Sequence, residues 1–364
     1  MNRKKLLDLL SLAKPCLSEQ DYIPVLGAFC FDHRAKQMTA YNGVQAVVID
    51  DLDIGISVGF PGSQLYKALA SYESKEEIEF EKRKENQYRV GTALLTALPS
   101  KDFIYEPWDI DDVKGYPIGK DFAEGLQKCL LSINSNKVLQ SQHGVTLRTL
   151  KNETCLYSTD GARLSKFVLK KHFGTSDIER LLPPPFCEIV ASIGKNFDEG
   201  TVYIGLDQIQ VNYENISIYS KMVAEVKLLD FEKAIDVFYK GDEDFQAIPP
   251  LLKERLVLAD IINPEKDGGV QIRTKKDRML MDTKGSGGHL NPDEEEIKFE
   301  LPFPTLKFYM NIQLLTQAVA AVSEITFVPD SRGEDDRAVF IGQDKNYLHI
   351  LASMSRQTYG GEAE

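Results

Sequence analysis

The sequence predicts an α+β fold in which one unit of about 120 residues occurs three times in tandem. Amphipathic helices with apolar side chains near positions i, i+3, i+4 and i+7 begin close to residues 61, 184 and 311, so they recur at a nearly constant interval. Each helix is followed by three runs typical of β-strands and is preceded by another helix and a strand pair. The recurrence of the whole ordered set predicts three similar domains, over 1–115, 116–236 and 237–364.

The first repeat begins with a helix over 2–15 and strands at 25–31 and 37–40. A second helix follows Pro61, which suits a first helical turn because its missing N–H would have no partner there. Strands are expected next at 77–81, 88–90 and 93–98, with the charge run 82–84 in an exposed turn. The apolar faces of the two helices consist of Leu6, Leu9, Leu10 and Ala13, and of Leu65, Ala68, Leu69 and Tyr72.

The second and third repeats follow the same order. The second has helices over 120–137 and 184–193, and strands at 145–148, 154–157, 201–204, 209–211 and 216–219. The third has helices over 251–262 and 311–322, and strands at 270–273, 278–281, 325–328, 338–341 and 347–351. In the first helix of the second repeat, the expected apolar face consists of Phe122, Leu126, Cys129, Leu130 and Ile133.

Composition excludes several classes of protein. The 364 residues are 43% hydrophobic, which is enough for packed cores and excludes general disorder. No apolar run is long enough to cross a membrane, and Asp8 and Lys14 interrupt the apolar stretch at the N-terminus, so neither a membrane span nor a signal peptide is expected. The net charge of −12 argues, as a total, against a nucleic-acid partner.

Motifs for catalysis or metal binding are not recognisable. The five cysteines and five histidines are scattered, which favours buried thiols in a reducing cytoplasm and no metal site. The glycine-rich segment 284–289 lacks the spacing of a phosphate-binding loop and is expected to be a flexible surface loop. The triplet 159–161 (Thr-Asp-Gly) indicates a tight turn between two strands. We therefore expect no enzyme activity, no cofactor and no metal.

Four short segments resemble the bacterial DNA polymerase III β subunit, the sliding clamp. Residues 23–27 (Ile-Pro-Val-Leu-Gly) resemble the segment after the first helix of that family, and residues 97–103, ahead of Trp108, resemble the junction that closes its first domain. Residues 158–164 (Ser-Thr-Asp-Gly-Ala-Arg-Leu) are similar to the Ala-Thr-Asp-Gly-His-Arg-Leu of its second domain, and 220–223 with 229–231 are similar to the junction that closes it. The resemblance extends to about Met354.

The resemblance implies a ring of six similar domains, formed by two chains head to tail. In the family, twelve helices line the hole and sheets form the outside. A head-to-tail contact closes into such a ring only if the rotation from one domain to the next is about one sixth of a turn. It implies a protein without catalytic activity that encircles duplex DNA, independently of base sequence, and holds a replicative polymerase on it as a processivity factor. The departures of this sequence from the family's motifs would also fit a member encoded by a phage. The location implied is the cytoplasm of a bacterial cell, with or without phage infection.

The distribution of charge agrees with this interpretation. The six predicted helices sum to +5, which leaves −17 for the rest of the chain. A mildly positive bore attracts phosphates through counterion release without gripping one of them. The residues expected to contact DNA are Arg3, Lys4, Lys5, Lys67, Lys128 and Lys137.

The resemblance also implies an apolar pocket for a short peptide of the polymerase or the clamp loader. It assigns the pocket to Thr159, Gly161, Arg163, Leu164, Leu229, Lys233, Ala234, Asn311, Ala352 and Met354. Three departures bear on which peptide fits. The histidine of the family is Ala162 here, its proline before the junction aspartate is Leu229, and its C-terminal motif is replaced from 352 onward.

Ring closure is implied between the first domain of one chain and the third domain of the other. The matching residues are Ala93 and Leu95 on an edge strand, and Ile261 and Ile262 at the end of a helix. Two alternatives remain at the level of the sequence: a ring-forming interaction protein that has the fold but no role in replication, and an enzyme on an α+β scaffold with an unrecognised site.

Overall fold

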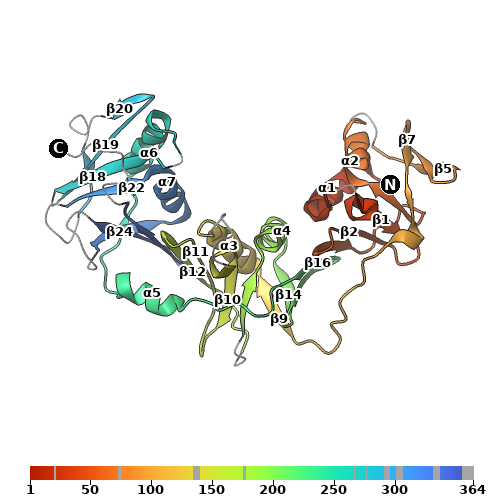
Figure 1. The fold of residues 1–364 in the computed structure, drawn as a ribbon, viewed down its shortest axis with the longest axis horizontal. Helices are drawn as coiled ribbons and strands as arrows, with labels where there is room; N and C mark the ends of the chain where they lie inside the picture. The colour runs from red at the N-terminus through yellow and green to blue at the C-terminus, as the bar shows by residue number, and fades with distance from the viewer. Residues whose placement is uncertain are drawn as a thin grey trace. The chain divides into compact units, whose positions relative to one another are not determined.

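The computed structural model describes residues 1–19, 22–72, 76–133, 140–174, 178–265, 267–275, 277–290, 296–300, 306–330 and 337–354 (Figure 1). The chain forms two compact units. The first contains Met1–Gln127, Lys170–Ser176 and Arg180–Val226, and the second contains Lys128–Leu169, Asp177–Glu179 and Lys227–Glu364. The middle third of the chain thus contributes to both units, and the boundary falls inside helix α3 (Lys120–Leu130).

The first unit is built on a nine-stranded sheet with the order β8-β4-β1-β2-β3-β16-β15-β14-β9 and on a separate three-stranded sheet, β5-β6-β7. Its helices are α1 (Arg3–Ala13), α2 (Gly62–Ala70) and α4 (Pro184–Gly194). Its strands are β1 (Ala28–Asp32), β2 (Gln37–Tyr41), β3 (Gln45–Ile49), β4 (Val58–Pro61), β5 (Phe80–Lys84), β6 (Gln87–Val90), β7 (Ala93–Thr96), β8 (Leu98–Pro99), β9 (Gly115–Gly119), β14 (Glu199–Ile204), β15 (Gln208–Tyr213) and β16 (Ile216–Lys221).

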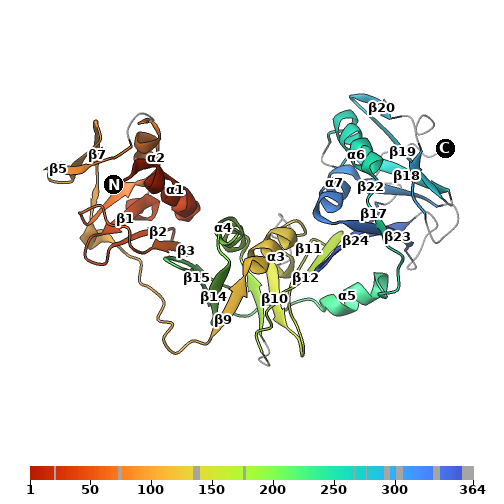
Figure 2. The same cartoon turned by 180° about the vertical axis from the view of Figure 1, so that it is seen from behind.

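Helices cover one face of the nine-stranded sheet. Helix α1 packs against α2, α4 and β3, and α4 packs against β16 (Figure 2). Leu6, Leu10, Leu65 and Leu69 are fully buried between these elements, and each such side chain contributes roughly 1.5–3 kcal/mol. Most of the apolar faces predicted for the first repeat are thus in its core, whereas Leu9 and Ala68 are half-buried and Tyr72 lies beyond the end of α2.

The second unit contains a sheet in which β10-β11-β12-β25-β24-β23-β17 are neighbours, and a five-stranded sheet of β20-β19-β18-β22 with β21 beside β19. Its helices are α5 (Phe231–Phe238), α6 (Pro250–Ile262) and α7 (Ile312–Ala321). Its strands are β10 (Val145–Thr149), β11 (Thr154–Thr159), β12 (Arg163–Val168), β17 (Gln246–Ala247), β18 (Gly269–Lys275), β19 (Arg278–Gly285), β20 (Gly288–Leu290), β21 (Ile297–Lys298), β22 (Lys307–Asn311), β23 (Glu324–Pro329), β24 (Ala338–Asp344) and β25 (Tyr347–Ala352). Strand β13 (Glu179–Leu182) spans the boundary between the units.

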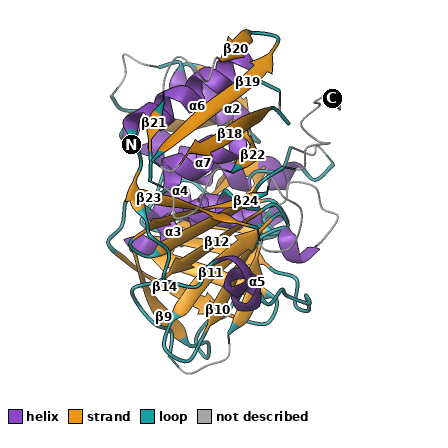
Figure 3. Cartoon of the chain, turned by 90° about the vertical axis from the view of Figure 1, so that its left-hand side faces the viewer, coloured by secondary structure: helices purple, strands orange, loops and turns teal. Residues whose placement is uncertain are grey.

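Helices lie on both faces of the first of these sheets. Helix α7 packs on β24 and β25, whereas α5 covers the opposite face, where Phe231 and Ile235 join a buried cluster with residues of β11, β12, β24 and β25. Helix α6 packs on α7 and against β19 and β20, and Figure 3 shows α6 and α7 beside strands β18, β19 and β22. All strand pairs between the described residues are antiparallel, which confirms the predicted α+β class. The division into three domains stays a prediction.

Several local expectations were wrong, and one is the strand over 77–81, of which only residues 80 and 81 belong to β5. Pro24–Gly27 form a 3-10 turn before β1, because proline cannot donate to a ladder. The run 82–84 is the exposed end of β5 and not a turn. Helix α3 ends at Leu130, so Ile133 lies outside it. The segment 284–289 is a hairpin of β19 and β20 and not an irregular loop.

The cysteines are all unpaired, and four of them are buried. Burial raises the pKa of Cys16 to about 12, so this thiol stays protonated and unreactive. Among the described residues, no helix is both long and apolar enough to span a bilayer. The same residues contain no cluster of three or more His, Cys, Asp or Glu side chains that could hold a metal ion.

Candidate functional site

The turn between β11 and β12 has a conformation fixed by its own side chains. Asp160 Oδ1 accepts hydrogen bonds from the backbone N–H groups of Ala162 and Arg163, both at 3.0 Å. Thr159 Oγ1 accepts from the N–H of Gly161 at 3.1 Å and donates to the carbonyl of Arg163 at 2.6 Å. Gly161 has a φ of +93°, which only glycine adopts without strain. The predicted tight turn is confirmed.

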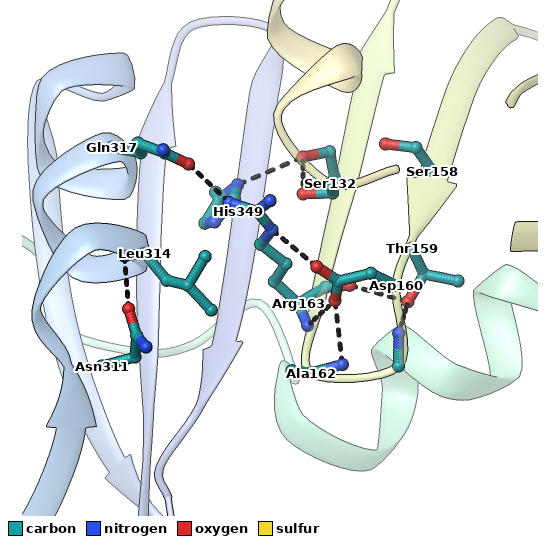
Figure 4. A network of polar contacts seen from close by, with 12 residues as sticks. Ser132, Ser158, Thr159, Asp160, Ala162, Arg163, Asn311, Leu314, Gln317 and His349 are labelled. Atoms are coloured by element: carbon teal, nitrogen blue, oxygen red, sulfur yellow. Dashed lines mark hydrogen bonds and ion pairs between the residues drawn. The ribbon is translucent and has the colours of Figure 1, made fainter. Parts of the chain in front are cut away.

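Arg163 connects this turn to helix α7. Its Nε donates to Asp160 Oδ2 at 2.9 Å and its Nη1 donates to Gln317 Oε1 at 2.7 Å (Figure 4). The side chain is only 12% exposed. The two hydrogen bonds fix the position of the guanidinium, and its low exposure leaves little of the charge free to attract groups in solvent. Arg163 is therefore a rigid part of the surface formed by β12 and α7.

Helix α7 begins beside this surface, at a residue of the predicted set. Asn311 precedes the helix, and its Oδ1 accepts from the N–H of Leu314 at 2.9 Å, which is an N-cap (Figure 4). The end of the described chain lies against the same strands. Ala352 N donates to the carbonyl of Ala162 at 2.9 Å, and Met354 N donates to the carbonyl of Tyr309 at 2.7 Å. Hydrogen bonds thus join the elements that carry these predicted residues: β12 to α7 through Arg163 and Gln317, and the C-terminal strand to the turn before β12 through Ala352 and Ala162.

Helix α5 lies next to the hairpin through side chains that the sequence did not single out. Phe231 stacks on Tyr157 with ring centroids 5.0 Å apart and an angle of 19° between the planes, and Leu164 belongs to the same buried cluster. Asp230 caps the helix by accepting from the N–H of Lys233 at 3.2 Å. The apolar spacing of Phe231 and Ile235 after this cap was a signal in the sequence for the helix.

The three predicted residues in and before α5 are exposed. Leu229 is 38% exposed, and Lys233 and Ala234 lie on the side of the helix that faces solvent. A cavity of about 480 Å³ lies between α5, β12 and the β24–β25 turn, and its lining includes Lys166, Glu232 and Leu348. None of the ten predicted residues lines it, so the predicted rim and this cavity are different parts of the surface.

A buried polar network lies behind Arg163, on the side of α7. The hydroxyls of Ser132 and Ser165 are 2.8 Å apart, and Ser165 Oγ lies 2.9 Å from the Tyr347 hydroxyl. His349 Nδ1 is 3.1 Å from Ser165 Oγ and 2.8 Å from the Tyr347 hydroxyl. His349 is fully buried, and its Nε2 contacts no hydrogen-bonding partner among the described residues. The sequence does not predict this network.

Burial makes the imidazole of His349 difficult to protonate. Desolvation, with a smaller contribution from the positive charge of Arg163, lowers its pKa to about 3. In the unfolded chain the pKa is close to the ordinary value of 6.5. Between these values the unfolded state binds a proton that the folded state does not bind. The folded state is therefore fully stabilised above pH 6.5 and loses stability as the pH falls through this window.

We expect the free energy of unfolding to decrease, through His349, by about 1.4 kcal/mol per pH unit below pH 6.5. Urea unfolding of the wild type and of His349→Gln at pH 7, 6 and 5 measures this contribution. The variant should have a smaller slope with pH, because glutamine does not titrate. Equal slopes for the two proteins would contradict the assignment.

The cations expected to contact DNA differ in their availability. Lys4, Lys5 and Lys67 are exposed on α1 and α2. Arg3 donates through Nη1 to the carbonyl of Leu69 at 3.1 Å. Lys128 pairs with Asp344 at 2.8 Å and its side chain is 16% exposed, and the ammonium lowers the pKa of the Asp344 carboxyl. Lys137 lies outside the described residues.

The residues expected to close the ring lie at the surface of their own units. Ala93 and Leu95 are half-buried on β7, an end strand of the three-stranded sheet, and Leu94 between them is 57% exposed. On α6, Ile261 is 65% exposed and Ile262 is half-buried. Val257 and Leu258 add exposed apolar surface to the same helix.

The elements described above have the fold of the bacterial sliding clamps, the β subunits of DNA polymerase III. A sliding clamp from Pseudomonas aeruginosa, in a structure with bound griselimycin, superposes with a TM-score of 0.82 at 17% identity over 98% of each chain. The β subunit from Thermotoga maritima gives 0.80 at 15% identity over 98% of each chain. A β subunit from Eubacterium rectale gives 0.80 at 14% identity, covering 97% of this chain and 98% of that one. No protein-family model and no curated protein matches the sequence.

Proposed function

We propose that this protein is a DNA sliding clamp: a homodimeric ring that encircles duplex DNA and tethers a replicative polymerase as a processivity factor. The observation that carries the proposal is the likeness to bacterial clamps over 98% of the chain, with a TM-score of 0.82 at 17% identity. An enzyme on this scaffold is less favoured, because the solved structures that match over nearly the whole chain are sliding clamps.

The exposed cations support a loose, sequence-independent hold on DNA. Lys4, Lys5 and Lys67 are exposed on helices α1 and α2, which pack together. None of the three forms an ion pair with another described residue. Separated ammonium groups attract phosphates at a distance and release counterions without reading bases. We assign DNA contact first to these three lysines, and Arg3 and Lys128 to supporting roles because both already have protein partners.

Ring closure would join the β7 edge of one copy to the α6 surface of the second copy. An open strand edge and an exposed apolar helix face each need cover, and a head-to-tail contact supplies both at once. With the three-domain division at 1–115, 116–236 and 237–364, two copies would give six domains. The ring would act in the cytoplasm of a bacterial cell, infected by a phage or not.

The surface of β12, α7 and the C-terminal strand is the proposed place for a clamp-binding peptide of the polymerase or the loader. Thr159, Arg163 and Asn311 supply polar groups whose positions are fixed by hydrogen bonds, and Met354 supplies an apolar one, whereas Leu164 is buried on the α5 side of the sheet. Ala162 stands where the resembling family has a histidine, so a smaller side chain would border the peptide at this position. The preferred peptide would differ accordingly from that of other clamps.

Threading on linear DNA tests the proposed function without a loader. Linear duplex fixed to a bead at one end is incubated with the protein, its free end is capped with a bulky protein, and the bead is washed in 1 M salt, at which the Debye length is about 3 Å. A ring should be retained when the end is capped and released when the DNA is cut. Protein that washes off capped and uncapped DNA alike would contradict encirclement.

A further inference from the structure

The segment between β8 and β9 crosses the face of the nine-stranded sheet that lies opposite the helices. We call residues 100–112 the strap; 103–110 have no regular secondary structure and run on the side of the first unit away from α1 and α4 (Figure 1). Phe103, Tyr105, Trp108 and Ile110 are half-buried, whereas the residues between them are exposed. The strap thus turns its aromatic side chains away from solvent.

Ring contacts hold the strap above the sheet. The ring of Tyr105 lies between Tyr41 of β2 and Tyr219 of β16, with centroid distances of 5.1 and 6.1 Å. A Cβ built at Gly205 would lie 3.1 Å from Trp108 Cζ2, so the indole rests on the backbone of the β14–β15 turn. These contacts fix the middle of the strap at the end of the sheet where β2 ends and β15 begins.

A cavity of about 720 Å³ lies beneath the strap. Its floor includes a row of side chains on four neighbouring strands, each opposite the next in the ladder: Cys30, Thr39, Val48 and Ser217. Gln210, which is 8% exposed, adds a polar side chain to the lining. The volume is in the range of ligand sites, about 300–1,000 Å³. The cavity therefore combines a partly polar floor with an aromatic lid.

Carboxylates without ion pairs surround this cavity. Asp32 and Asp50 are half-buried in its lining, and Gln37 between them donates through Nε2 to Asp50 Oδ1 at 2.6 Å. Five more carboxylates are exposed along the strap: Asp102, Glu106, Asp109, Asp111 and Asp112. None of the seven forms an ion pair with another described residue. The lining and the strap contribute two cations, Arg34 and Lys101, so the surface is negative overall.

Exposed apolar side chains flank the strap. Ile104 on the strap is 51% exposed, and Leu206 in the β14–β15 turn, next to the contact with Trp108, is 72% exposed. Val44 and Val223 lie at the same end of the sheet, where the N–H of Lys221 donates to the carbonyl of Val44 at 2.9 Å. An occupant that covers this surface needs apolar side chains as well as positive charge. A basic peptide has both, whereas a polyamine has only the charge.

We propose that the cavity beneath the strap is a docking site for a short basic segment of a partner protein. Its Lys or Arg side chains lie against the carboxylates of the strap, and its apolar side chains enter the cavity and cover Leu206. Charge complementarity selects this occupant, because seven carboxylates against two cations repel nucleic acids and acidic peptides. The site lies within the first unit alone, apart from the β12–α7 surface of the second unit, and does not depend on the proposed function.

The sequence contains one tryptophan, Trp108, which reports on the site directly. The fluorescence of the full chain is followed while capped peptides of about eight residues are added, in which Lys or Arg alternates with Leu or Phe. The emission should change saturably. Peptides with Glu in place of the cations, peptides with Ser in place of the apolar residues, and spermine should each bind at least about tenfold more weakly. No saturable change up to about 1 mM basic peptide, or spermine that binds equally well, would overturn the inference.

Charge variants show whether the strap supplies the attraction. The double variant Glu106→Gln with Asp109→Asn keeps the size of both side chains and removes two charges beside Trp108. It should raise the dissociation constant of the basic peptide about fivefold or more. The matched control, Asp8→Asn with Glu188→Gln, removes two exposed charges from α1 and α4 and should stay within about twofold of the wild type. Equal effects of the two double variants would contradict docking at the strap.

Filling the cavity tests the location without a change in charge. Thr39→Phe and Ser217→Leu each place a larger apolar side chain on the floor, on different strands, and should weaken binding about tenfold or more. Circular dichroism and the melting temperature identify which variants are folded, and a folded variant that binds like the wild type would overturn the inference. The proposed function would then still stand, because threading on DNA does not use this cavity. Failure of threading with peptide binding intact would contradict the proposed function alone.

Discussion

Ile261→Asp should convert the protein from a dimer to a monomer. Ile261 is 65% exposed in the single chain, so aspartate is tolerated there by the monomer. In the ring the same position would be covered by apolar groups of the second copy, and an unpaired carboxylate buried there costs about 3–5 kcal/mol. Since each ring contains two such contacts, the dissociation constant should rise at least about 10,000-fold.

Sedimentation velocity measures this directly, because the chain has a mass of 41.0 kDa and the dimer twice that mass. Leu206→Asp is the control: Leu206 is 72% exposed and belongs to no surface assigned to self-association. The control should remain dimeric. A dimeric Ile261→Asp protein would refute the assigned interface. The double variant Ile261→Asp with Ile262→Asp should also be monomeric.

Phe231→Ala should destabilise the second unit and detach α5 from the sheet. Phe231 is 1% exposed and stacks on Tyr157, and removing a buried aromatic ring of this kind costs about 3–5 kcal/mol. The remaining attachments are weaker. Glu232 accepts from the Tyr157 hydroxyl and pairs with Lys166 at 3.2 Å, in a place where it is 37% exposed.

Urea unfolding and hydrogen exchange over 231–238 measure the effect. The amides of α5 should exchange much faster in the variant than in the wild type. Val237→Ala on the same helix is the matched control, because Val237 is 41% exposed and its truncation should change stability by less than about 0.5 kcal/mol. A Phe231→Ala protein as stable as its control would show that α5 is held by other contacts.

Much of the fold could be predicted from local pattern. The apolar spacings in 2–15, 184–193 and 311–322 predicted α1, α4 and α7 to within a few residues, and alternation predicted strands such as β14 and β25. These signals are local because a helix or strand buries one face and so imposes its own period on the chain. The hairpin of β19 and β20 was missed because a glycine-rich segment resembles a flexible loop in the sequence. Only the structure shows that the backbone of α6 leaves no room for a side chain at Gly285 and Gly287.

The candidate site divides in a similar way. The turn at 159–163 was predictable, because its hydrogen bonds join residues at most four positions apart. The two partners of Arg163 differ in this respect. Asp160 is three residues away in the sequence, whereas Gln317 is distant in the sequence and belongs to helix α7. The network around His349 joins residues 132, 165, 347 and 349, and no pattern in the sequence relates these positions.

By itself, the sequence determined the repeated order of helices and strands, the segregation of charge onto the helices and the turn at Gly161, because each depends on residues that are close in the chain. Only the tertiary structure decided which side chains are available. It placed Lys128 in an ion pair and left Lys4 and Lys5 in solvent, buried Phe231 and exposed Lys233, and brought Gly287 to the carbonyl of Ile262. These outcomes depend on burial, which is set by segments that are distant in the chain and meet only when the core packs.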